Sequence, residues 1–182
     1  ADGAMECIDV DSKAVVGSMK GHVHAVRTLA CHPKQALLLS CATDAAILWN
    51  TSDFCRVRVL PTGGQPHAPL QHALFLPSGD GLLTCAERTL TLWRLSSFEA
   101  AATFCLPPAH GGTLKLRTCA VTPDSALAVG AGEGGWLAVW SLRTGSLVRM
   151  VLLPEALSCI SHLAPLPSQL APPPTAAAAD GA

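Results

Sequence analysis

The 182-residue sequence predicts an all-β fold built from repeated units of four short strands, which is the organisation of β-propeller blades. Trp49, Trp93 and Trp140 each end a short apolar run, and they recur at intervals of 44 and 47 residues. The run TLTLW at 89–93 alternates with the period of two that half-buried strands require. The sequence shows no helical apolar stripe of about ten residues or more, so a helical repeat is disfavoured.

The same four strand-like runs follow one another in each predicted unit, separated by turns rich in Pro, Gly, Ser and Asp. In the first unit they are VRTLACHP, ALLLSCAT, AAILW and CRVRVL. In the second they are QHALFLPSG, GLLTCAE, TLTLW and AATFCL, and in the third LRTCAVTPD, ALAVGAG, WLAVW and SLVRMVLL. Four short strands per unit of about 45 residues is typical of a propeller blade.

The positions of these runs predict a division of the chain into blades and partial blades. The predicted parts are 1–20 as the last strands of a preceding blade, 21–62, 63–107 and 108–154 as blades 1, 2 and 3, 155–166 as the first strand of a further blade, and 167–182 as a disordered tail rich in Pro and Ala. A closed propeller usually needs six or seven blades, or roughly 280 to 320 residues. The sequence therefore predicts an incomplete propeller and indicates a piece of a longer protein.

Composition and charge exclude several classes of function. Apolar residues make up 49% of the chain and charged residues 14%, which is unlike a disordered tail. A net charge of −1 without any Lys/Arg cluster argues against binding to nucleic acid or to an anionic membrane surface. The longest apolar runs are far shorter than the roughly 20 residues that span a bilayer, so membrane insertion is not expected.

The eight cysteines do not resemble a zinc site, because none are paired as CxxC. Most lie inside apolar runs such as LACH, LLSCAT and LLTCAE. We therefore expect them to be small buried hydrophobic residues in a reducing compartment.

The glycine–histidine pair at 21–22, Asp44 and Trp49 have a spacing that resembles the WD-repeat family of β-propellers. In that family the histidine donates to an Asp in the turn between strands two and three, and a Ser or Thr hydroxyl and the indole N–H complete a buried network. The resemblance implies that His22, Asp44 and Trp49 form such a network, with Ser40 as the hydroxyl and Thr43 as the alternative. Asp44 is then expected to be structural, because a buried carboxylate needs hydrogen-bond donors.

The other two predicted blades depart from this pattern, although Trp93 and Trp140 hold the corresponding tryptophan positions. The position that corresponds to Asp44 is Glu87-Arg88 in blade 2, and in blade 3 it falls within GEGG. Neither is expected to rebuild the network, so only blade 1 should keep it. His67 and His110 lie near the joints between blades and are expected to be ordinary loop histidines.

The order of several motifs resembles one subfamily of large WD-repeat proteins, which also carry a TBC domain and a coiled coil. The motifs are MECIDVDSKAVVGSMKGH, ALFLPSGDGLLTC, CAVTPDSALAVGAG and LAVWSLRTGSLVRMVLLP, within roughly residues 5 to 167. The resemblance implies a cytoplasmic adaptor of centrosomes and centriolar satellites, linked to cilium assembly. TBC domains are associated with Rab GTPase activation, but this chain contains no arginine-finger or glutamine-finger motif to carry that activity.

The chain is thus predicted to be a non-catalytic interaction module that binds other proteins through the loops at one rim of the propeller. The predicted contacts are Thr43, Glu87 and Arg88, beside the turn before the third strand, and His24, just after the joint. The alternative is a propeller that serves an enzyme complex, as the regulatory arm of a Rab GTPase-activating protein or as the substrate receptor of a ubiquitin ligase.

Catalytic residues, cofactors and metal ions are not expected. His22, His24 and His32 have no Asp or Glu at ligand spacing, and His32 sits at a strand end. The run GAGEGG at 130–135 lacks the GK[ST] of a phosphate loop and is predicted to be a β-turn. Ser40, His22 and Asp44 could be drawn as a triad, but the chain has no GxSxG elbow to expose a nucleophile.

Overall fold

The structure, a computed structural model, describes residues 3–60, 68–107, 115–153, 160 and 163–164. Every regular element in this part of the chain is a β-strand, and all strand pairs are antiparallel. The predicted all-β fold is therefore confirmed. None of the described residues form a helix that is long and apolar enough to cross a membrane.

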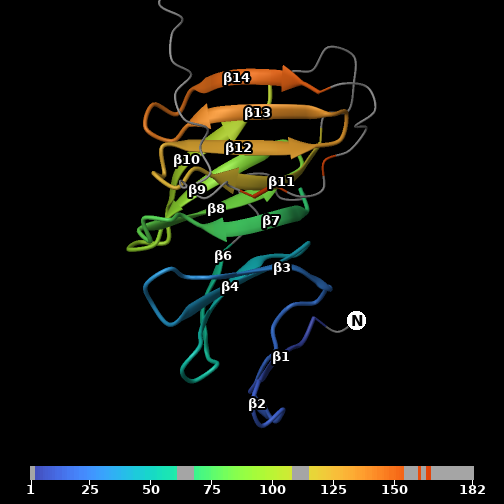
Figure 1. The fold of residues 1–182 in the computed structure, drawn as a ribbon, viewed down its shortest axis with the longest axis vertical. Helices are drawn as coiled ribbons and strands as arrows, with labels where there is room; N and C mark the ends of the chain where they lie inside the picture. Colours follow the sequence, from blue (N-terminus) through green and yellow to red (C-terminus); the bar gives the residue numbers. More distant parts are fainter. Residues whose placement is uncertain (1–2, 61–67, 108–114, 154–159, 161–162, 165–182) are drawn as a thin grey trace, which may run out of the picture.

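Fourteen strands are found in the described residues, as one two-stranded sheet and three four-stranded sheets (Figure 1). The N-terminal pair is β1 (Met5–Ile8) and β2 (Val15–Met19). Sheet 1 contains β3 (Val26–Cys31), β4 (Leu37–Ala42), β5 (Ala46–Asn50) and β6 (Arg56–Leu60). Sheet 2 contains β7 (Leu70–Phe75), β8 (Gly81–Ala86), β9 (Thr89–Arg94) and β10 (Ala100–Cys105). Sheet 3 contains β11 (Leu116–Val121), β12 (Leu127–Gly132), β13 (Trp136–Ser141) and β14 (Leu147–Leu152). Strands pair in chain order within each sheet, as in a propeller blade.

The same hairpin turn joins the last two strands of every sheet. Its outer backbone bond runs from Asn50 to Cys55 in sheet 1, with equivalents in the other sheets at Asp9–Ala14, Arg94–Glu99 and Ser141–Ser146. The penultimate residue of each turn has a positive φ: Lys13, Phe54, Phe98 and Gly145. The pair β1–β2 therefore corresponds to the third and fourth strands of the other sheets.

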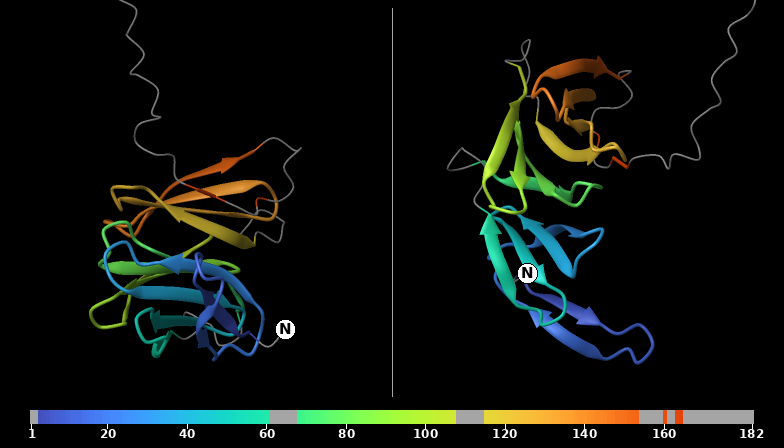
Figure 2. Two further views of the ribbon diagram at one scale, coloured as in Figure 1. Left: turned by 60° about the horizontal axis from the view of Figure 1, so that its bottom comes forward. Right: turned by 90° about the vertical axis from the view of Figure 1, so that its left-hand side faces the viewer.

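The three four-stranded sheets are stacked along the long axis of the molecule, with β1–β2 at one end and β11–β14 at the other (Figures 1 and 2). The first strand of a sheet packs on the first two strands of the sheet before it: β7 contacts β3 and β4, and β11 contacts β7 and β8. The end of the sheets where the first strands begin is called the top face below, and the opposite end the bottom face. These names are independent of the view in Figure 1.

Backbone hydrogen bonds join neighbouring sheets at the top face. The Leu70 N–H donates to the Thr43 carbonyl at 3.4 Å, and the Leu116 N–H donates to the Glu87 carbonyl at 2.7 Å. A similar bond runs from the Ile160 N–H to the Gly132 carbonyl at 3.0 Å, one residue before the position equivalent to Thr43 and Glu87. Of the predicted strand at 155–166, only residues 160, 163 and 164 are described, and the predicted tail at 167–182 lies outside the described residues, as do His67 and His110.

The hydrophobic core lies between sheets rather than inside any one of them. Between sheets 1 and 2, the side chains in contact include Leu39, Cys41, Leu48, Ala73 and Phe75. A second cluster, around Leu83, Phe104 and Trp140, fills the space between sheets 2 and 3. A smaller cluster joins Met5 and Met19 to Ile47 and Trp49. Each sheet therefore depends on its neighbour for most of its apolar burial.

The expectation that the cysteines are mostly buried holds for only part of the described set. Cys41, Cys85 and Cys119 are buried in the clusters between sheets. Cys31, Cys55 and Cys105 are exposed, so for these the expectation was wrong. Period-two alternation turns every second residue of a strand away from the neighbouring sheet, and an apolar run does not reveal which residues those are.

Candidate protein-interaction surface

The hydroxyl of Ser40 is the centre of a buried polar cluster in sheet 1. The indole Nε1–H of Trp49 donates to Ser40 Oγ at 2.8 Å, and His22 Nε2 lies 2.7 Å from the same oxygen. The Ser40 side chain also lies 3.4 Å from the carbonyl of Ile47, the residue opposite it on β5. Ser40, and not Thr43, therefore supplies the hydroxyl between His22 and Trp49. Because Ser40 is fully buried and bonded to Trp49, it is not placed to attack a substrate.

Asp44 lies beside this cluster in the turn between β4 and β5. Its Oδ2 accepts a hydrogen bond from the Val23 N–H at 3.2 Å. Its Oδ1 lies 3.5 Å from His22 Nδ1 and 3.7 Å from His24 Nδ1. The structure shows no hydrogen bond between His22 Nδ1 and Asp44 Oδ1, and both atoms are buried. Asp44 therefore anchors the loop that enters β3 mainly through the backbone of Val23.

The pKa of the Asp44 carboxyl reflects two opposing influences. Partial burial acts to raise the pKa, because it disfavours the charged form. Hydrogen bonds from the backbone N–H groups of Val23 and of Asp44 itself, together with the neighbouring His22 ring, outweigh burial and lower the pKa below its ordinary value. Asp44 is thus a carboxylate at neutral pH.

Sheet 2 keeps one part of the cluster that sequence reasoning did not predict. The indole Nε1–H of Trp93 donates to Thr84 Oγ1 at 2.9 Å. Thr84 pairs with Thr91 just as Ser40 pairs with Ile47, so the two hydroxyls hold equivalent positions. A Ser or Thr nine residues before the tryptophan is the sequence pattern that would have predicted this hydrogen bond.

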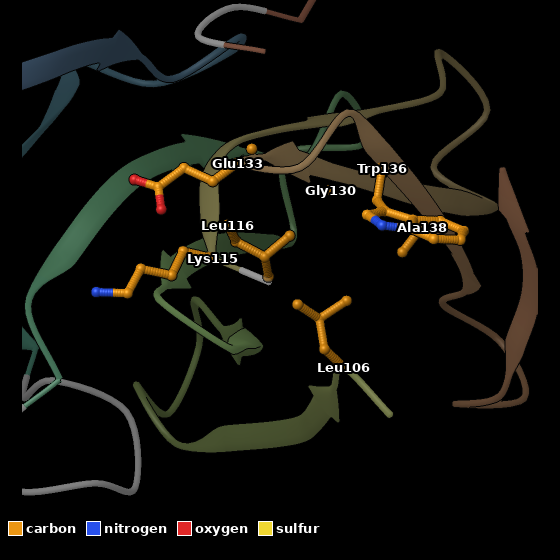
Figure 3. A pocket seen from close by; sticks show the side chains of 8 residues that line it. Leu106, Lys115, Leu116, Gly130, Glu133, Trp136 and Ala138 are labelled. Carbon is orange, nitrogen blue, oxygen red and sulfur yellow. The ribbon is translucent and has the colours of Figure 1, made fainter. Parts of the chain in front are cut away.

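Sheet 3 replaces the hydroxyl with glycine. Gly130 pairs with Ala138 at the equivalent position, and a Cβ there would lie 2.8 Å from Leu116 Cδ2 and 3.0 Å from the Trp140 ring. Figure 3 shows the small cavity beside it, which has a volume of about 10 Å³ and is lined by Leu106, Lys115, Leu116, Gly130, Gly132, Glu133, Trp136 and Ala138. A cavity of this size has room for roughly one water molecule and not for a ligand.

The four predicted contact residues lie on the top face, on two neighbouring sheets. His24 has an exposed side chain, at 61%, beside Asp44. The Thr43 carbonyl accepts the bond from sheet 2 described above. Glu87 pairs with Lys115 of sheet 3, at 3.1 Å between Oε1 and Nζ. Arg88 is exposed, and its guanidinium donates to the Pro107 carbonyl at 3.1 Å.

Glu87 and Arg88 also line a hollow at this end of sheet 2. It has a volume of about 180 Å³, and its lining residues are Ala68, Glu87, Arg88, Thr89, Cys105 and Leu106. Backbone bonds hold both of its charged residues in place: the Glu87 carbonyl accepts from Leu116, and the Arg88 carbonyl accepts from Leu106 at 3.0 Å. The structure therefore presents these side chains from a fixed backbone.

Sequence reasoning missed a second polar group at the top face, formed by Arg27, Gln71 and Arg117. These residues hold the same position on the first strands of sheets 1, 2 and 3. The Arg27 and Arg117 guanidinium groups both donate to Gln71 Oε1, at 2.6 Å and 3.2 Å. Arg117 also donates to Glu133 Oε1.

Metal ligation has no geometric support within the described residues, where no group of three His, Cys, Asp or Glu side chains is arranged to hold an ion. His32 lies at the bottom end of β3, away from His22 and His24. Its Nε2 lies 2.9 Å from the Gly79 carbonyl, while its Nδ1 accepts from the Lys34 and Gln35 N–H groups. His32 thus links sheets 1 and 2.

Two features define a segment of a WD-repeat β-propeller. The four-stranded sheets repeat and stack through buried tryptophans, and sheet 1 carries the His22–Ser40–Trp49 cluster. In agreement, the family model for the WD domain, G-beta repeat, matches residues 13–50. The chain is thus an incomplete propeller of the WD-repeat class.

Within this class, the chain is similar to proteins named TBC1 domain family member 31. It is 30% identical to the protein from Oryzias latipes over 172 residues, and 28% identical to those from Xenopus tropicalis over 169 residues and Homo sapiens over 168 residues. Each comparison covers 92% of this chain but only 15% or 16% of the relative. The chain is also 28% identical, over 115 residues, to the WD repeat, SAM and U-box domain-containing protein 1 of Danio rerio, covering 62% of this chain and 23% of that protein.

Proposed function

We propose that this chain is a non-catalytic scaffold segment that binds partner proteins through its top face. The observation that carries the proposal is the fixed backbone of the top-face turns, whose carbonyls at Thr43 and Glu87 accept hydrogen bonds from the next sheet. A surface held in this way loses little conformational entropy on binding. WD repeats typically serve protein–protein interaction, which agrees with this role.

We further propose that the scaffold acts within a cytoplasmic adaptor of centrosomes and centriolar satellites, linked to cilium assembly. This step is supported by similarity to the TBC1 domain family member 31 proteins over 92% of the chain. Because the chain spans so small a share of those relatives, their activities and partners come to it only as proposals.

Photo-crosslinking from the top face tests the interaction role. A photoreactive amino acid at His24 is compared with one at Thr144, which is exposed on the bottom face. The tagged chain is expressed in ciliated cells, and crosslinked proteins are identified by mass spectrometry. We expect a distinct set of proteins from position 24, and microscopy should place the chain at a centrosome marker. Identical sets from both positions would contradict the proposed use of the top face.

A second candidate function is service to an enzyme complex, as the regulatory arm of a Rab GTPase-activating protein or as the substrate receptor of a ubiquitin ligase. It is favoured by the names of the relatives, which include a TBC1 domain and a U-box domain. The same crosslinking distinguishes the candidates: a receptor should capture proteins that accumulate when the proteasome is inhibited, and a regulatory arm should capture a Rab GTPase.

A further inference from the structure

The first strand of each four-stranded sheet contains a β-bulge at the same place. The register shifts between Val26 and Thr28 on β3, between Leu70 and His72 on β7, and between Leu116 and Thr118 on β11. The residues left out of the pairing are Arg27, Gln71 and Arg117, and these three are called the bulge row. A bulge re-aims the side chain it carries, so three sheets present polar groups side by side near the top face.

Gln71 is the centre of the bulge row. Its Oε1 receives the guanidinium groups of both Arg27, at 2.6 Å, and Arg117, at 3.2 Å. Its Nε2 lies 3.4 Å from the Pro69 carbonyl, which fixes the orientation of the amide. Only 5% of Gln71 is exposed, so the shared oxygen is held in place. Two positive charges therefore converge on one neutral acceptor.

The charges of the bulge row are only partly balanced. Arg117 is paired with the carboxylate of Glu133. Among the described residues, no carboxylate oxygen lies within 4.0 Å of the exposed Arg27 guanidinium. The nearby Glu87 carboxylate is paired with Lys115. The arrangement thus has an excess of positive charge, at a point that a partner can reach.

On the basis of the proposed role of the top face, we propose that the bulge row binds a carboxylate from an acidic, extended segment of a partner protein. Arg27 is the main contact, because its planar guanidinium can form two parallel hydrogen bonds with a carboxylate. A negative charge beside Arg27 also offsets the repulsion between the two guanidinium groups on Gln71. A nucleic acid fits less well, because the top face offers separate cations rather than a basic track and the chain has a net charge of −1.

Binding of fluorescein-labelled hexaglutamate, followed by fluorescence anisotropy at low salt, tests this proposal. Hexaglutamine serves as the uncharged control probe. Arg27→Gln should weaken hexaglutamate binding by about tenfold, the ratio that one charge-assisted hydrogen bond supplies. Arg143→Gln removes the same charge from an exposed position on the bottom face, and it should change binding by less than about twofold.

Gln71→Glu gives an independent test, because it places a carboxylate of nearly the same shape between the two arginines. This internal carboxylate should pair with the arginines in place of the carboxylate of the ligand. We expect a higher midpoint of thermal unfolding together with hexaglutamate binding weakened by about tenfold or more. Unchanged hexaglutamate binding in folded Gln71→Glu would contradict the proposal.

Failure of this inference is distinguishable from failure of the proposed function. If hexaglutamate does not bind, or if Arg27→Gln and Arg143→Gln weaken it equally, the bulge row is not the docking site for acidic segments. The same holds if a single-stranded oligonucleotide binds more tightly than hexaglutamate and depends on Arg27. Crosslinking from position 24 reports on the top face in each of these cases.

Discussion

At the scale of single residues, the Ser40 hydroxyl links two side-chain nitrogens for which the described residues offer no other hydrogen-bond partner. His22 Nε2 and Trp49 Nε1 both contact Ser40 Oγ in a site closed to solvent. In sheet 2, the Thr84 hydroxyl accepts a hydrogen bond from Trp93 and from no other side chain in the described part of the chain. Sheet 1 thus has a polar cluster of three side chains and sheet 2 has one of two, so the contribution of the third side chain to stability can be compared within one molecule.

Ser40→Ala should therefore be more costly than Thr84→Val. The first change leaves two buried polar atoms unpaired, which should lower the free energy of unfolding by about 2 to 4 kcal/mol. The second keeps the shape of the side chain and leaves one atom unpaired, with an expected loss of about 1 to 2 kcal/mol. Urea unfolding followed by circular dichroism measures both. Equal losses would show that His22 contributes nothing through Ser40.

The lowered pKa of Asp44 gives stability a dependence on pH. Because the folded-state pKa lies below the ordinary value of 3.8, the carboxylate stabilises the fold at pH values above 3.8. This contribution is lost as the pH falls through the folded-state pKa. Asp44→Asn should therefore be less stable than the unmodified chain at pH 6, and the difference should shrink below pH 3.8.

Thermal unfolding of Asp44→Asn between pH 2 and pH 6 checks this expectation. Asp11→Asn is the matched control, because Asp11 is exposed in the turn between β1 and β2. The control should follow the unmodified chain over the whole range. A constant difference between Asp44→Asn and the unmodified chain would indicate that the charge of Asp44 is not what stabilises the loop.

The buried and exposed thiols should differ sharply in reactivity. Burial raises the pKa of Cys41 to about 12. The side-chain contact with Cys85 raises the pKa of Cys119, and burial raises it further. Thiolates are the reactive form, so these residues should react with maleimide only after unfolding. Cys31, Cys55 and Cys105 are exposed and should be labelled first. Mass spectrometry after timed labelling of the native chain measures the order, and early labelling of Cys41 would contradict it.

At the scale of the elements, the interval between tryptophans and the period-two alternation were sufficient to predict the strands. The bulges could not be predicted in this way, because a bulge is a property of how two strands pair. In the sequence, Arg27 and Gln71 look like ordinary polar positions of an alternating strand. The same limit applies to Thr84, whose bond to Trp93 depends on register rather than on an acidic motif.

Close packing of strands at Gly132 gives a prediction for sheet 3. A Cβ at Gly132 would lie 1.9 Å from the Lys115 carbonyl oxygen, which belongs to the backbone at the start of β11. Gly132→Ala should therefore separate β11 from β12 and lower the free energy of unfolding by about 3 kcal/mol or more. The measurement is urea unfolding of the variant.

Gly145→Ala is the matched control for this change. Gly145 has a φ of +72°, but no heavy atom lies within 4 Å of a Cβ placed there. Only the backbone strain of a left-handed residue is added, at a cost of about 1 kcal/mol. Gly132 itself has no positive φ, so its substitution adds no such strain. Equal destabilisation of the two variants would therefore contradict the explanation by the contact with Lys115.

At the scale of the whole molecule, stacking leaves one sheet face uncovered in the described chain. Leu29, Ala73 and Cys119 hold equivalent positions on β3, β7 and β11, opposite Ser40, Thr84 and Gly130. Ala73 and Cys119 are exposed by 2% and 1%, because the preceding sheet covers them. Leu29 is exposed by 56%, because the pair β1–β2 corresponds only to the third and fourth strands of a sheet.

This difference predicts opposite outcomes for the same substitution at two equivalent positions. Leu29→Glu places a charge in water and should change the free energy of unfolding by less than about 0.5 kcal/mol, while reducing self-association. Ala73→Glu buries an unpaired carboxylate between sheets 1 and 2. The native state should then fail to form, so that no cooperative unfolding transition is seen. Circular dichroism melts and size-exclusion chromatography of the 182-residue chain measure both effects. If Leu29→Glu is as damaging as Ala73→Glu, the face of sheet 1 that carries Leu29 is covered in solution. A second copy of the chain is then the first partner to test on that face.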